Sequence, residues 1–255
     1  MASKYFTVEV KPTIPASLQH AAQFGSGNVL FDWTSFQVPR GANKLVNITA
    51  LVRGKGDSTP TSNNKDFQVV FSKSNTQSLG TPNSNAISRP SNDYLGHVDI
   101  VAADYMSTIM RSTTVASVGN ATGSNVLPLV IQGDITTGDN VGYDTLYVGS
   151  VCHNTSMDFI SINAIAENTD ADHADSQEIT MDGSSMDVRH HFIAGDVVHI
   201  GTSVGTPAAD SLVGTIASAD STTQITLEAV SPTDLVDGDI LYNIHPIRLV
   251  LQFER

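Results

Sequence analysis

The stretch IRLVLQFE at residues 247–254 points to the fold class, because every second side chain in it is large and apolar. The apolar positions are Ile247, Leu249, Leu251 and Phe253, and the residues between them include Arg248 and Gln252. Successive side chains of a β-strand point to opposite faces, so a period of two predicts a strand with one buried and one solvated face. Such strands are typical of antiparallel sheets.

The same alternation opens the chain and recurs along it. In Tyr5–Val10 (YFTVEV), the apolar residues Phe6, Val8 and Val10 share one face. Runs rich in Gly, Pro, Ser and Asn separate the alternating segments, as turns require. Only Ala103–Arg111 favours a short helix, so we predict an all-β protein. Further strands are predicted at Leu30–Val38, Val46–Val52, Phe67–Phe71, Leu95–Ala102, Val126–Gln132, Thr145–Val151 and Phe159–Ala166.

The composition also favours many strands joined by many turns. Of the 255 residues, 40% are hydrophobic and 15% are charged, against about 25% charged in an average globular protein. Ser, Thr, Asn and Gly replace the missing charges, and Asp greatly outnumbers Glu. These residues favour turns and caps over helix interiors.

We predict an antiparallel β-sandwich, jelly-roll-like, that carries an inserted module. The sandwich comprises residues 1–168 plus 246–255, since first and last strands often share a sheet. Residues 174–245 form a small acidic β-barrel-like module, because they hold several short strands and two turns, Gly195-Asp196 and Gly238-Asp239, each before an apolar strand. One continuous two-lobed β-domain is the alternative.

The charge is unevenly distributed along the chain, whose net charge is −13. Residues 1–73 hold eight bases and four acids, whereas residues 170–245 hold 13 acids and a single base, Arg189. We expect no nucleic-acid binding, because phosphate contacts need a basic patch. The asymmetry indicates two faces or modules in different surroundings, and a well-solvated acidic half is the simpler interpretation.

Targeting signals and reactive cysteines are not predicted. The opening MASKYFTVEV has no apolar signal core, and no run approaches 18 apolar residues, so we expect synthesis in the cytoplasm without a signal peptide and no membrane segment. The single cysteine, Cys152, lies in an apolar run. It is predicted to be a small buried hydrophobic residue rather than a nucleophile or ligand.

Gly201–Gly205 (GTSVG) matches the G-x-S-x-G pattern, in which Ser203 would be a nucleophile. That chemistry needs a strand, a sharp turn and then a helix. Here Pro207 and a polar run to Asp210 follow instead, so a Gly-rich turn between strands is the preferred interpretation. A hydrolase that uses Ser203, or a pair of distant carboxylates, is kept as a competing hypothesis, and we predict no catalytic residue.

Two sets of residues are weak metal candidates. Asp170, Asp172 and Asp175 alternate in DADHAD, as aspartates do in calcium loops, but the glycine and terminal glutamate of an EF-hand are missing. A solvated acidic loop is therefore the default interpretation. His190 and His199 are a second candidate pair, for zinc. We expect no cofactor and no metal.

Aromatic residues, which form the platforms of many sugar sites, are scarce at 6% with a single tryptophan. Trp33 is interpreted as a core or interface residue. If the protein does bind glycans, a groove near Trp33, Tyr143 or Tyr147 is predicted.

Several phrases resemble virion structural proteins of marine tailed bacteriophages, especially those that infect cyanobacteria. At the N-terminal end these phrases are YFTVEVKPTIPAS, LFDWTSFQVP and KLVNITALVRG. Near the other end they are FIAGDVVHIG, LVGTIAS, TQITLEAV and GDILYNIHPIRLVLQFER. They are structural phrases and identify no catalytic residue.

The resemblance implies a non-enzymatic capsid decoration or cement protein on the virion surface, made in the host cytoplasm. Its partner would be the major capsid protein, and self-association is expected, with a homotrimer favoured as in similar proteins. A tail, baseplate or fibre component, or a receptor- or glycan-binding module, is the alternative.

Overall fold

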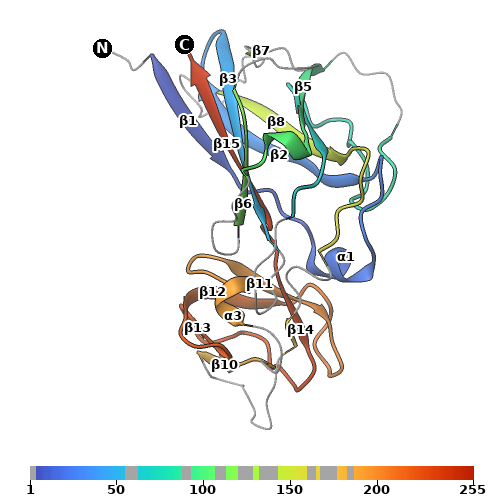
Figure 1. Ribbon diagram of the computed structural model, residues 1–255, viewed down its shortest axis with the longest axis vertical. Coiled ribbons are helices and arrows are strands. Elements are labelled where there is room, and N and C mark those ends of the chain that lie inside the picture. The colour runs from blue at the N-terminus through green and yellow to red at the C-terminus, as the bar shows by residue number, and fades with distance from the viewer. Residues whose placement is uncertain are drawn as a thin grey trace.

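The computed structural model describes residues 4–54, 63–87, 93–106, 113–119, 129–131, 143–159, 165–166, 177–182 and 187–255. Two antiparallel sheets form a sandwich at one end of the molecule, and a third antiparallel sheet forms the other end (Figure 1). The all-β prediction is confirmed.

The strands of the sandwich come from both ends of the chain. The first sheet has the order β1-β15-β3-β6, with the short β7 also pairing with β3, and the second has the order β2-β8-β4-β5. Their bounds are β1 Tyr5–Val10, β2 Val29–Pro39, β3 Asn43–Arg53, β4 Phe67–Ser72, β5 Tyr94–Ile100, β6 Thr113–Val118, β7 Leu129–Ile131, β8 Tyr143–Cys152 and β15 Ile247–Glu254.

This strand order is that of a jelly roll. If the eight strands other than β7 are numbered in chain order, the sheets read 1-8-3-6 and 2-7-4-5, the two four-stranded sheets of that fold. The first and last strands pair directly, from Tyr5 opposite Glu254 to Val10 opposite Leu249. The predicted sandwich, and the expectation that its terminal strands lie together, are therefore confirmed.

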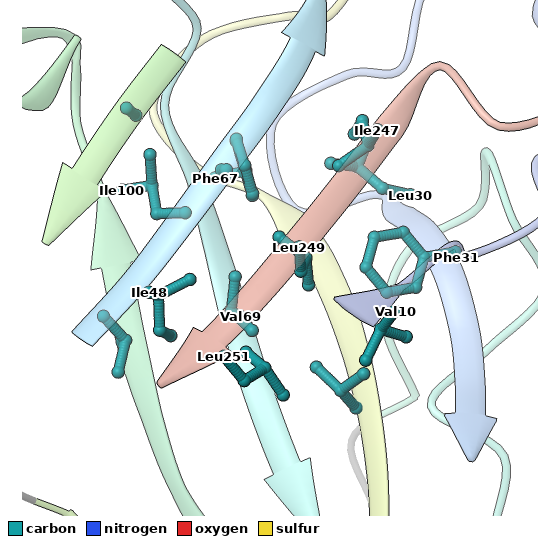
Figure 2. Packing of buried hydrophobic residues seen from close by; sticks show 14 of the residues in the cluster. Val10, Leu30, Phe31, Ile48, Phe67, Val69, Ile100, Ile247, Leu249 and Leu251 are labelled. Atoms are coloured by element: carbon teal, nitrogen blue, oxygen red, sulfur yellow. The ribbon is translucent and has the colours of Figure 1, made fainter. Parts of the chain in front are cut away.

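The period-two pattern buries one face of each sheet in a single hydrophobic core. The strand β15 lies between β1 and β3, and its residues at 247, 249, 251 and 253 are fully buried. Leu249 and Leu251 point toward Phe67 and Val69 of the second sheet (Figure 2). The sequence stretch with the clearest alternation is thus central to the core.

The remaining strands, β9 to β14, lie in the chain between β8 and β15 and form a separate sheet. We call them, with α3, the inserted module. Their order is β10-β13-β12-β11-β14-β9, and their bounds are β9 Ile165–Ala166, β10 Glu178–Thr180, β11 Val197–Thr202, β12 Leu212–Ala219, β13 Gln224–Leu227 and β14 Ile240–Asn243.

The inserted module has its own apolar cluster, which includes Phe192, Val198 and Ile200. Its sheet is open, because in the described residues the two edge strands β9 and β10 do not pair with each other. The barrel-like form that we expected is therefore wrong. Short strands and turns fix the local hairpins, but closure depends on pairing between edges that are far apart in sequence.

The helices of the described residues are short. They are α1 (Ala16–Ala21), the 3₁₀ turn η1 (Ala102–Asp104) and α3 (Val188–His191). Of the expected helix Ala103–Arg111, the structure describes residues 103–106. There the 3₁₀ turn ends at Asp104, and Tyr105 then forms a β-bridge with Ala116 of β6. None of the helices in the described ranges has the length and apolar character that a bilayer crossing requires.

Candidate functional site

The serine of the G-x-S-x-G pattern lies in a turn at the end of β11. The Ser203 hydroxyl donates to Asp239 Oδ1 (2.8 Å) and accepts from the backbone N–H of Gly205 (3.0 Å). The chain then runs through bends and turns to β12, with no helix after the serine. The preferred interpretation as a turn agrees with this geometry, because Ser203 is held by a buried carboxylate rather than presented on a strand-to-helix elbow.

The remaining chemical candidates give no assembled site in the described residues. Asp170, Asp172 and Asp175 lie outside those residues. His190 belongs to α3, and the Nδ1 of His199 contacts the backbone carbonyl of Asp210 (2.7 Å). Across the described ranges, no three His, Cys, Asp or Glu side chains gather as metal ligands.

Cys152 is buried at the end of β8, as predicted. Burial raises the pKa of its thiol to about 12, although a backbone hydrogen bond to Met157 acts in the opposite direction. At neutral pH the thiol is therefore protonated, and a protonated thiol is a poor nucleophile and metal ligand.

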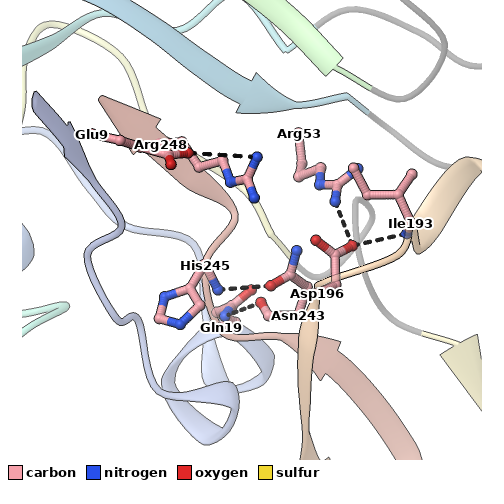
Figure 3. Close-up of polar contacts among 8 residues, drawn as sticks. All are labelled: Glu9, Gln19, Arg53, Ile193, Asp196, Asn243, His245 and Arg248. Atoms are coloured by element: carbon pink, nitrogen blue, oxygen red, sulfur yellow. Dashed lines mark hydrogen bonds and ion pairs between the residues drawn. The ribbon is translucent and has the colours of Figure 1, made fainter. Parts of the chain in front are cut away.

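A buried ion pair joins the sandwich to the inserted module. The guanidinium of Arg53, at the end of β3, contacts the Asp196 carboxylate, and both side chains are less than 10% exposed. The same carboxylate accepts the backbone N–H of Ile193 (3.0 Å; Figure 3). A buried charge is tolerated only when it is paired and hydrogen-bonded, so this contact fixes where the two regions meet.

The segment around α1 makes a second attachment. The buried amide of Gln19 donates to the carbonyls of Ile14 (2.8 Å) and Asn243 (3.0 Å), and the Asn243 side chain accepts the backbone N–H of His245 (2.8 Å; Figure 3). On the other side of the helix, Ser17 donates through its backbone and hydroxyl to Asp210. The inserted module is thus held at several points, not by its two connecting chains alone.

A pocket of about 230 Å³ lies at this junction, between the outer face of the first sheet and Ile193. Its polar side chains have partners: Arg53 pairs with Asp196, Arg248 approaches Glu9 (3.7 Å), and His245 Nδ1 contacts the Pro12 carbonyl (3.0 Å). The pocket is therefore part of the attachment and has no arrangement of groups directed at a ligand.

The end of the sandwich remote from the inserted module is different. We call it the basic end, and it comprises the charged residues Lys4, Arg40, Lys44 and Arg255 and the exposed apolar residues Tyr5, Val130 and Tyr143. In the first sheet, strand register places Tyr5 and Lys44 beside Glu254, and Val130 beside Lys44. In the second sheet Tyr143 pairs with Pro39, and the carbonyl of the next residue, Arg40, accepts a hydrogen bond from the Arg255 side chain (3.4 Å). These basic side chains meet two acidic ones, since Glu254 pairs with Lys4 (2.6 Å) and Lys44 (3.5 Å) and Asp144 lies 3.6 Å from Arg40.

Two features make the basic end suitable for docking. Its apolar residues are unusually open, with Tyr5 and Val130 each 59% and Tyr143 49% exposed. A shallow pocket of about 340 Å³, lined in part by Tyr5, Phe6 and Phe253, opens beside them. Tyrosine and arginine are enriched at protein interfaces relative to the rest of the surface.

The inserted module presents the opposite charge. Its exposed acids are Glu178, Asp182, Asp210, Asp220, Glu228, Asp234 and Asp237. Its one Lys or Arg side chain, Arg189, pairs with Asp187 (2.6 Å). The charge asymmetry of the sequence therefore becomes a separation along the long axis of the molecule (Figure 1).

Comparisons with protein families, with curated proteins and with solved structures find no match to this chain. Only part of this charge separation could be predicted from the sequence. The acid-rich segment can be counted in the sequence, but the basic end depends on strand register, which brings together residues from positions 4, 40, 130, 143 and 255.

Proposed function

We propose that this chain is a non-enzymatic virion protein of a tailed bacteriophage that decorates or cements the capsid. In this proposal the basic end binds an acidic surface across neighbouring major capsid subunits, and the inserted module projects away from the shell. The observation that carries the proposal is the separation of charge between the two ends. The resemblance of the sequence phrases to phage virion proteins supplies the context.

The attachment of the inserted module supports a projecting role. A domain on a flexible tether would need few contacts with the sandwich, whereas this one is fixed by a buried ion pair and by the amide of Gln19. An exposed acidic surface that is rigidly held repels the acidic surface to which the basic end binds. Docking would therefore be favoured in one orientation.

Self-association, with a homotrimer favoured, is part of the proposal. In the described part of the chain β1 pairs with β15 alone, so its other edge is open. By contrast, residues 83–86 cover β2, where Val29 exchanges backbone hydrogen bonds with Asn83 and Ser84. An open edge must be covered or blunted to avoid indiscriminate pairing, and contact with a second copy would achieve this.

The test is cryo-electron microscopy of the particle that carries this chain. Density for the sandwich repeated over the shell, with the basic end against joints between major capsid subunits, is the expected result. Density confined to the tail, or a few copies only, would favour a tail, baseplate or fibre component instead.

A capsid-binding measurement tests whether the basic end is the surface that docks, independently of where the protein lies on the particle. Lys44→Glu with Arg40→Glu should lower occupancy on purified capsids by roughly tenfold or more. The matched control is Glu228→Lys on the exposed surface of the inserted module, which should leave occupancy unchanged. If the control abolishes binding and the basic-end variant does not, the proposed orientation is wrong.

A further inference from the structure

The outer face of the second sheet carries a shallow pocket of about 250 Å³, away from both charged ends. It is lined by Gln68 and Val70 of β4 and by Tyr94, Gly96 and His97 of β5. Val70 lies opposite His97 on one side and Gly149 on the other. Gly149 is covered, because a Cβ there would meet Leu79 at 2.9 Å and the Trp33 ring at 3.1 Å, so the pocket lies over β4 and β5.

Two aromatic rings, Trp33 and Tyr94, lie close together on this face of the sheet. Trp33 lies where the register between β2 and β8 shifts, and a Cβ on Gly149 would approach its ring to 3.1 Å. The Trp33 ring is held by its N–H, which donates to the Gln77 carbonyl (2.7 Å), and it lies 6.0 Å from the ring of Tyr94. Tyr94 remains 44% exposed.

Trp33 is therefore not a core residue, because its ring packs on the outer face of the sheet and lies outside the sandwich core. Of the two tyrosines named for the predicted groove, Tyr143 lies at the basic end, and Tyr147 pairs with Ser35 of β2 and Ser72 of β4. The aromatic partner of Trp33 is Tyr94, which is distant in sequence and belongs to no recognisable motif. Two aromatic residues of this chain thus lie together on an outer face, where composition alone predicted little stacking surface.

One polar group of the pocket, the Gln68 amide, is oriented before any ligand binds. The Gln68 amide donates to Asp99 Oδ1 (2.8 Å), which fixes the direction of its side chain, and the exposed His97 lies on the neighbouring strand. Planar amide and imidazole groups can donate to and accept from hydroxyls at the same time. An aromatic ring beside such groups offers an apolar surface next to hydrogen-bonding edges.

We propose that this pocket binds a single ring of an uncharged saccharide. The apolar C–H face of the sugar packs on Tyr94, and its hydroxyls bind Gln68 and His97. The volume suits one ring, since pockets for larger organic ligands span roughly 300–1,000 Å³. Among the described residues that line the pocket there is no Lys or Arg, which favours an uncharged ligand over a phosphate or a nucleic acid. This site is independent of the docking role proposed for the basic end.

The test is ligand-observed NMR of the purified full chain against a panel of neutral mono- and oligosaccharides. Saturable binding with a dissociation constant in the millimolar range or tighter is expected for at least one sugar. Tyr94→Ala and Gln68→Ala should each weaken it roughly tenfold. Tyr143→Ala, which removes a comparably exposed tyrosine at the basic end, is the matched control and should leave it unchanged.

Thermal unfolding of each variant shows whether the fold is kept, and little change is expected because Tyr94 and Tyr143 are both exposed. If no sugar in the panel binds saturably, the proposal is wrong. It is equally wrong if sugar binding survives Tyr94→Ala in a folded protein. Neither result bears on capsid docking, which the particle structure tests separately.

Discussion

Two turns of the inserted module have the same backbone geometry and different partners. Residues 193–196 and 236–239 each end in Gly-Asp, and the glycines adopt φ values of 84° and 90°. In each turn the aspartate N–H donates to the carbonyl three residues earlier, at 3.1 Å for Asp196 and 3.0 Å for Asp239. Each carboxylate also accepts the N–H of that same earlier residue. A strand follows both turns, as the sequence predicted.

The difference lies in what else each carboxylate binds. Asp239 accepts the Ser203 hydroxyl and the Val204 N–H, both from the end of β11, so it closes the inserted module on itself. Asp196 instead meets Arg53 of the sandwich. The same local motif therefore makes an internal contact of the module at Asp239 and a contact with the sandwich at Asp196. The local sequence fixes the turn, but the fold decides which further partner reaches the carboxylate.

The largest effect is expected at the internal turn. Asp239 is fully buried, and Asp239→Ala removes the acceptor for three donors. Hydrogen bonds to a charged group each contribute about 1.5–3 kcal/mol, so the free energy of unfolding should fall by about 4 kcal/mol. Chemical denaturation measures this. Asp237→Ala, on an exposed neighbour, is the control and should change stability by less than about 0.5 kcal/mol.

The next effect is expected at the attachment. Arg53→Met leaves Asp196 buried without its cation, which should lower the free energy of unfolding by about 3 kcal/mol. Hydrogen exchange should also become faster in residues 193–196 and 243–246, where the two regions meet. Arg248→Met is the matched control, because Arg248 and Glu9 are both substantially exposed, and its effect should stay below about 1 kcal/mol. Equal effects of the two variants would contradict the distinction between the turns.

The strands that could be predicted are those in which large apolar residues alternate with polar ones. For Tyr5–Val10 the predicted and observed bounds agree, and β15 extends the predicted Ile247–Phe253 by one residue. The strand β6, Thr113–Val118, was missed because its side chains are small and half of them are polar. Its pairing with β3, not its own pattern, makes it a strand.

Long-range arrangement explains the other failures. The helix α1 has six residues and a proline before it, and its contacts with β11 and β14 hold it in place. Likewise, no local pattern connects Arg53 to Asp196, or Trp33 to Tyr94. The candidate surfaces are products of the jelly-roll order, so the sequence could supply their residue types but not their positions.

A smaller effect is expected from the serine that Asp239 holds. Ser203→Ala removes one hydrogen bond to the carboxylate and one from Gly205, and should destabilise the protein by about 1 kcal/mol. Because the hydroxyl is engaged in a turn, we expect no labelling of Ser203 by a fluorophosphonate probe. Labelling that Ser203→Ala abolishes would instead support the hydrolase hypothesis.

The smallest effect is expected at Asp187, which also pairs with an arginine but lies nearer the surface. A hydrogen bond from the Arg189 side chain lowers the pKa of the Asp187 carboxyl from its ordinary value of 3.8 to about 2. A lowered folded-state pKa stabilises the protein above the unfolded-state pKa, and that contribution disappears as the pH falls through about 2. The ion pair at this position therefore matters at neutral pH and not in strong acid.

Arg189→Gln should raise the pKa of Asp187 toward 3.8, as measured by NMR titration of the side-chain carboxyl carbon. Stabilities of the variant and the original chain should differ slightly at neutral pH and converge below pH 2. The Asp220 carboxyl is the internal control, because the Thr226 hydroxyl lowers its pKa and no arginine is involved. An unchanged Asp187 titration would mean that Arg189 does not hold this carboxylate in solution. Among these aspartates, only the buried Asp196 would then depend on an arginine.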